Sequence, residues 1–180
     1  MRLTTPILIL ATMVIPAFCQ EPEKVAICDA FRQPERWIGK MIEIRGIIEP
    51  MGSVFLTGRD CRDHVVFGQA RFENFINLAD PKDKRLTRLS VGYEWSPASW
   101  QALNYAIQYS RLYGERITAT VIGMFETDTR KEAMVSKFDP TRGMAYGDQG
   151  VAPIQILVKE LKDIVRQPLP KSATGDRPLR

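Results

Sequence analysis

The chain is poor in the residue types on which most catalytic and metal sites depend. Its 180 residues include a single histidine, His64, and three cysteines. One histidine excludes a histidine-rich zinc site within one subunit. A Ser-His-Asp system would need His64 as its base, and no Gly-x-Ser-x-Gly element presents a serine to it. We interpret Asp60 and Asp63, close by in sequence, as polar loop residues, and we expect no metal and no cofactor.

Other motifs with a defined chemistry are also missing. Gly143, Gly147 and Gly150 are spaced for turns, and no lysine-serine pair follows them as in a phosphate-binding loop. No repeat of fixed period runs through the chain. The composition, 44% hydrophobic and 26% charged, is that of an ordinary globular protein, and the length fits about one domain. A disordered chain, a collagen-like rod and a multi-spanning membrane protein are excluded.

The N-terminus has the pattern of a secretory signal peptide. Arg2 precedes an uncharged apolar stretch at residues 6–15, and small residues follow at Ala17 and Cys19. Ten apolar residues are too few to span a membrane. We expect residues 1–19 to be removed and the protein to be exported, periplasmic or secreted; cleavage after Ala17 is the second choice. A lipoprotein anchored through Cys19 is an alternative, although Phe18 occupies the place normally taken by a small residue.

The charge of the chain is concentrated at its ends. The formal net charge of +4 falls to +3 without Arg2, and the tail from Gln167 contributes +2 of this, which leaves the body near +1. Such a body has no basic surface for nucleic acid, and we expect none to bind. With three prolines and little apolar content, residues 167–180 are predicted to be a disordered tail.

Two cysteines, Cys28 and Cys61, remain after the favoured cleavage. Disulfides persist outside the cytoplasm, so this pair is best interpreted as a bridge. Closing a loop of about 34 residues would stabilise the fold by roughly 3.5–4 kcal/mol in the chain-entropy model. Two unlinked buried thiols are the alternative.

The body is predicted to be five strands with two helices. Residues 25–33 favour a short helix. Alternating apolar and polar residues predict strands at 41–48, 53–57, 64–68, 116–125 and 153–165. Gly123 lies on the inward row of the fourth strand, where a closed barrel needs a close backbone approach or a bend.

The clearest helix begins after Ser96 as N-cap, with Pro97 in its first turn, and Gly114 ends it. We interpret its tryptophan and tyrosines as core packing. Residues 69–95 are hard to assign, and Phe72, Phe75, Ile76 and Leu78 suggest a turn of helix or a packed loop.

This order predicts a mainly β fold over residues 25–166. It is a five-stranded, OB-like Greek-key barrel with a short N-terminal helix and one helix between the third and fourth strands. The turn at Pro50–Gly52 leaves no room for the helix that a ferredoxin-like sheet needs after its first strand.

A resemblance supports the same architecture. The segments that carry it are Cys28–Phe31, Trp37–Lys40, Ile42–Gly46, Phe55–Leu56, Asp60–Cys61, Tyr146–Asp148 and Ala152–Val158. Together they resemble exported bacterial proteins of unknown function with OB-fold-like domains, in which a leading helix is tied to the loop after strand two. That group tends to have Gly-His where this chain has Gly147-Asp148. The resemblance implies fold and export, and no activity.

For function, the sequence favours a non-enzymatic binding or accessory module whose partner is a protein, peptide or glycan outside the cytoplasm. OB barrels bind through their second and third strands and adjoining loops. On this basis Thr57, Val66 and Gly68 would lie on the binding face, and Lys131 in the long loop beside it. The candidate binding residues are Phe55, Arg130, Lys137, Phe138, Arg142 and Tyr146.

The alternative is a carboxylate-dependent hydrolase or nuclease using residues such as Glu43, Glu49, Asp60 and Asp63. Glu43 and Arg45, on one strand face, are more simply a surface ion pair.

Overall fold

A computed structural model describes residues 21–67, 70–83, 89–127, 134–135, 143–144, 146 and 152–169. Its elements are, in chain order, β1 (Glu23–Val25), α1 (Ile27–Arg32), the 3-10 turn η2 (Pro34–Arg36), β2 (Met41–Met51), β3 (Ser53–Thr57), β4 (Val66–Phe67), β5 (Ala70–Arg71), β6 (Phe75–Ala79), α2 (Pro97–Tyr113), β7 (Glu115–Thr127), β8 (Met134–Val135), β9 (Gly143–Met144) and β10 (Ile154–Pro168). The predicted signal peptide, and all but the first three residues of the predicted tail, lie outside the described residues.

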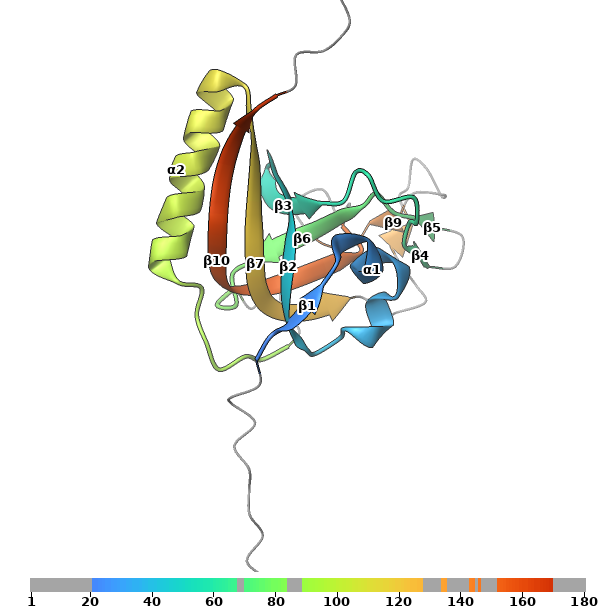
Figure 1. The fold of residues 1–180 in the computed structure, drawn as a ribbon. Helices are drawn as coiled ribbons and strands as arrows, with labels where there is room; N and C mark the ends of the chain where they lie inside the picture. Colours follow the sequence, from blue (N-terminus) through green and yellow to red (C-terminus); the bar gives the residue numbers. More distant parts are fainter. Residues whose placement is uncertain are drawn as a thin grey trace, which may run out of the picture.

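Five strands form a closed mixed barrel. The order is β2-β3-β6-β10-β7, and β7 pairs with β2 to close it. Only the β6–β10 pair within the barrel is parallel. Figure 1 shows β7 and β10 as the two longest strands, with helix α2 packed alongside them. The mainly β class predicted from the sequence is confirmed.

Apolar side chains at alternate positions along the strands fill the interior of the barrel. Leu56, Ile76, Ile117, Val121 and Phe125 are fully or almost fully buried in one continuous core. Gly123 lies on the same inward row of β7. A Cβ atom at this position would collide with the Leu157 carbonyl oxygen, so any larger residue would push β7 and β10 apart. Of the two roles predicted for Gly123, a close backbone approach or a bend, the structure shows the close approach.

Two predictions about the strands are wrong. Of the strand predicted at 64–68, the described residues 64–67 do not join the barrel: within the described chain, Val66–Phe67 pairs with β5 in a separate two-stranded sheet. The strand that follows β3 in the barrel is β6, within the segment interpreted as helix or packed loop. At the N-terminus the helix begins at Ile27, since Val25 belongs to β1 and pairs in parallel with Ile44 of β2.

Helix α2 has the ends predicted for it. The Ser96 side chain accepts a hydrogen bond from the Ser99 backbone N–H, and Gly114 ends the helix with φ 62°. Ser99 also covers the free edge of β10: the Leu161 N–H donates to its hydroxyl at 3.1 Å, and the Ser96 N–H donates to the Lys159 carbonyl at 2.9 Å. The helix therefore satisfies backbone groups that the barrel leaves unpaired.

The interpretation of the α2 aromatics as core residues is wrong. The helix buries mainly small and aliphatic side chains, among them Leu103, Ala106 and Ile107. Tyr105 and Tyr113 are 56% and 67% exposed; the Tyr113 ring stacks on Tyr109, and the Tyr105 ring contacts Tyr109 at a tilt. Residues four positions apart lie on the same side of a helix, so the three tyrosines share one side of α2. Helical spacing alone does not show which side of the helix faces the barrel.

A disulfide joins α1 to the loop after β3. The Cys28 and Cys61 sulfur atoms are bonded, and their Cα atoms are 5.2 Å apart. Phe31, from the same helix, is buried in the barrel core. Arg32 adds an ion pair with Asp63 at 2.9 Å, but both side chains are about half exposed, so this contact contributes little. The predicted bridge is confirmed.

Replacing Cys28 should destabilise the protein only where the bridge can form. We expect Cys28→Ser to lower the free energy of unfolding by about 2–5 kcal/mol in oxidising buffer. Under reduction it should change little, because the wild-type protein then lacks the bridge as well. Denaturant unfolding with and without dithiothreitol measures both, and the double variant Cys28→Ser/Cys61→Ser controls for the thiol left at Cys61. An equal loss in both buffers would contradict the stabilising role.

The side chain of Tyr93, which precedes α2, links two barrel strands by hydrogen bonds. Its hydroxyl donates to the Leu157 carbonyl oxygen at 2.7 Å and accepts from the Met124 N–H at 2.9 Å. Leu157 and Met124 are partners across the β10–β7 pair, so the phenol bridges the two longest strands. Burial raises the pKa of Tyr93 to about 12, although the hydrogen bond from Met124 acts in the opposite direction.

Tyr93→Phe should therefore cost stability in a pH-dependent way. At pH 7 we expect a loss of about 1–3 kcal/mol, because Met124 N–H and Leu157 C=O lose a partner. In the unfolded chain the phenol titrates near pH 10, and the folded protein keeps its proton up to about pH 12. The wild-type advantage is thus complete below pH 10 and declines as the pH rises towards 12. Urea unfolding at pH 7, 10 and 11.5 tests this, with the exposed Tyr113→Phe as the control; a difference that stays constant with pH would contradict the prediction.

Candidate functional site

The structure brings together two of the residues predicted to bind a ligand, and it buries both. Phe55 is completely buried and Tyr146 is 7% exposed, and with Ala152 they form a small apolar cluster on the outside of the barrel. Phe75 packs on Phe55 with ring centroids 5.5 Å apart. Thr57 is buried as well, whereas Val66 is exposed. Arg130, Lys131, Lys137, Phe138, Arg142 and Gly68 lie outside the described residues.

Beside this cluster, a row of polar side chains crosses three strands. Strand register places Phe55 opposite Asn77, Asn77 opposite Gln155, and Gln155 opposite Glu126. Asn77 donates its amide N–H to Gln155 Oε1 at 2.9 Å, and Gln155 donates to Glu126 Oε2 at 2.8 Å. All three side chains are buried. Since their neighbours along each strand face the barrel core, this row lies on the outer face of the sheet.

The surface beside the same strands is hollowed at one end of the barrel. A groove of about 410 Å³ lies between the β2–β3 turn, the end of β6 and the start of α2. Its volume is within the range of small-ligand and side-chain pockets. Its lining residues are Gly52, Ser53, Val54, Asn77, Leu78, Ala79, Asp80, Asp83, Trp95, Pro97 and Trp100.

Two tryptophans form one side of this groove. Trp95 is buried against the barrel core, while Trp100 is 42% exposed. Their rings meet edge to face with centroids 4.8 Å apart, which holds the Trp100 indole in place. Val54, Leu78, Ala79 and Pro97 complete a mainly apolar lining. A partly exposed, fixed aromatic ring over apolar side chains is typical of a binding surface.

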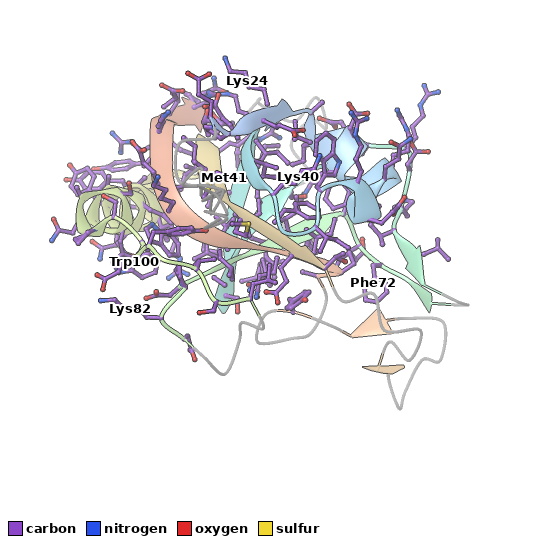
Figure 2. The ribbon with its side chains drawn as sticks, turned by 90° about the horizontal axis from the view of Figure 1, so that it is seen from below. Lys24, Lys40, Met41, Phe72, Lys82 and Trp100 are labelled. Carbon is purple, nitrogen blue, oxygen red and sulfur yellow. A yellow bond between two sulfur atoms is a disulfide. The ribbon has the colours of Figure 1, made fainter. Side chains whose placement is uncertain are left out.

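Among the described residues, Asp80, Lys82, Asp83 and Glu94 determine the charge beside the groove. Asp80 is exposed, and its Oδ1 accepts the Lys82 backbone N–H at 2.9 Å. The Lys82 ammonium lies 2.8 Å from Glu94, and this hydrogen bond raises the pKa of Lys82. Figure 2 shows Lys82 and Trp100 at the same end of the molecule, away from Lys24. The negative charge of Asp80 also raises the pKa of Lys82. Among the described residues at this rim, three carboxylates, Asp80, Asp83 and Glu94, accompany one cation, Lys82, so this part of the rim is negative overall.

The carboxylates considered for catalysis do not converge. Glu43 lies 3.7 Å from Lys162, Glu49 pairs with Arg59, and Asp63 pairs with Arg32. Arg45 approaches Asp163 and donates to Thr120, so the ion pair expected between Glu43 and Arg45 is replaced by contacts across the sheet. Over the described ranges, no three metal-binding side chains gather, and no helix is long and apolar enough to cross a membrane.

Sequence reasoning missed the groove altogether. Its walls come from three separate segments, and none of them contains a recognisable motif. The one usable signal was the pair Trp95 and Trp100 on either side of the Ser96–Pro97 helix start, but Trp100 was interpreted as a core residue. The chain matches no protein-family model, no curated protein and no solved structure.

The buried polar row should be essential to stability. Gln155→Leu removes both hydrogen bonds that connect Asn77 to Glu126, and we expect it to lower the free energy of unfolding by about 2–5 kcal/mol because buried polar groups lose their partners. Denaturant unfolding measures the effect, and the exposed helix residue Gln101→Leu is the matched control. A loss below about 0.5 kcal/mol would show that the row is not a structural network.

Proposed function

We propose that this chain is an exported, disulfide-stabilised OB-like barrel that acts as a non-enzymatic binding or accessory module. The groove beside Trp100 is its binding site. The observation that carries the proposal is the groove itself, an apolar cleft with a fixed and partly exposed indole at the end of a rigid barrel. Its partner is a protein, peptide or glycan outside the cytoplasm.

The strand arrangement supports the OB-like part of the proposal. The barrel runs β2-β3-β6-β10-β7 and closes on β2, with one parallel pair. Helix α2 lies between β6 and β7 in the chain. A closed barrel of five strands supports an OB-like fold, which is a five-stranded Greek-key barrel. The groove includes the β2–β3 turn, one of the regions through which such barrels bind their ligands.

Two features support export. Residues 1–19 have the charged start, apolar centre and small-residue end of a signal peptide. The Cys28–Cys61 bridge is of a kind that persists in oxidising compartments.

The lining of the groove favours binding over hydrolysis. A carboxylate-dependent hydrolase would need acidic side chains converging on the substrate together with a cationic group. Among the described lining residues, Asp80 and Asp83 are accompanied by two tryptophans and by no arginine or lysine.

Capture from the native cell envelope tests the proposed site. We expect the mature protein to crosslink to a partner, and Trp100→Ala to reduce its recovery at least about tenfold, because an aromatic anchor contributes a large share of binding energy. Tyr105→Ala, on the exposed stripe of the same helix, should leave recovery unchanged. Equal recovery with wild type and Trp100→Ala would exclude the groove as the binding site.

A further inference from the structure

The composition of the groove narrows the class of ligand, on the assumption that the groove is the binding site proposed above. Its floor is aliphatic, formed by Val54, Leu78 and Ala79, and the Trp100 ring stands at its side. A bound group therefore has to present hydrocarbon to most of this surface. A neutral glycan is disfavoured, because its many hydroxyl groups would lose water and find few polar partners there.

The rim adds a charge requirement. The Asp80 carboxylate is exposed at the groove, and one of its oxygens accepts a backbone N–H. The nearby Lys82 cation is hydrogen-bonded to Glu94 and is also attracted by Asp80, but Asp80, Asp83 and Glu94 still outnumber it among the described residues of this rim. A ligand that is apolar along its length and positively charged at its end would complement both parts of the site. An indole beside the path of such a cation adds a favourable cation–π contact.

We propose that the groove receives the side chain of a lysine or arginine from a partner polypeptide. The alkyl stem of that side chain lies along the Trp100 ring and the aliphatic floor, and its cationic head reaches the Asp80 carboxylate. Long basic side chains regularly bury their stems in this way while their charged ends stay near solvent. A nucleic acid does not fit, because its phosphates would meet a negative rim.

Short peptides with and without the charge test this assignment. The probes are Ac-Leu-Arg-Leu-NH2 and its neutral isostere Ac-Leu-citrulline-Leu-NH2, titrated into the mature, disulfide-bonded protein. Binding is followed by tryptophan fluorescence and by the NMR signal of the Trp100 indole. We expect the arginine peptide to bind about tenfold more tightly, and its advantage to shrink as salt is raised.

Two variants test whether Asp80 is the group that recognises the positive charge of the peptide. Asp80→Asn should remove the preference for arginine over citrulline while leaving citrulline binding unchanged. Asp60→Asn, an exposed carboxylate outside the groove lining, is the control and should keep the preference. Since Asp80 is exposed, the variant is expected to fold, and its melting temperature and NMR spectrum verify this.

Other outcomes separate this inference from the proposed function. Equal affinity for the two peptides would overturn the basic side-chain assignment, and so would a preference that survives Asp80→Asn. Binding of neither peptide, with Trp100-dependent binding of maltohexaose, would also overturn it while leaving the groove as a binding site. If the captured partner is recovered equally well with the Trp100→Ala variant, the proposed function itself is overturned.

Discussion

The constraint on which the rest of the structure depends is the double pairing of β7. This strand is hydrogen-bonded to β2 on one edge and to β10 on the other, so it closes the sheet into a barrel. Closure pairs most strand edges within the barrel, and α2 covers the part of the β10 edge that stays unpaired. It also requires the backbones of β7 and β10 to approach closely at Gly123, where no side chain would fit. The Tyr93 hydroxyl, which belongs to the segment before α2, also joins these two strands by hydrogen bonds to Leu157 and Met124.

The parts of this fold that were predictable from sequence have strong local signals. The strand β7 alternates over most of its length, and α2 is bounded by Ser96, Pro97 and Gly114, each of which has a specific role at a helix end. The disulfide could be predicted from a simple count, because two cysteines remain once the predicted signal segment is set aside. In each case the structure is determined by residues that are close together, or by a covalent bond that few pairs can form.

The strands β1 and β6 were missed because tertiary contacts determine them. The strand β6 has five residues and is buried on both faces, so it shows no clear alternation of polar and apolar residues. Its Asn77 resembles a loop residue in sequence, and only the partnership with Gln155 from β10 makes it acceptable in a strand. The three-residue β1 exists because it pairs in parallel with β2. No local pattern contains that information.

The candidate site was unpredictable for a related reason, since it is assembled from segments that meet only when the barrel closes. One of these segments, β3, contributes the groove residues Ser53 and Val54 at its beginning, and the loop at its end contains Cys61. That loop is fixed to α1 by the disulfide and α1 to the core by Phe31, so the position of β3 is constrained from the side opposite the groove. A groove whose wall is held in this way would lose little conformational entropy on binding a ligand. The disulfide and the groove therefore lie at opposite ends of β3, and the groove wall formed by this strand is held in place by the covalent bond.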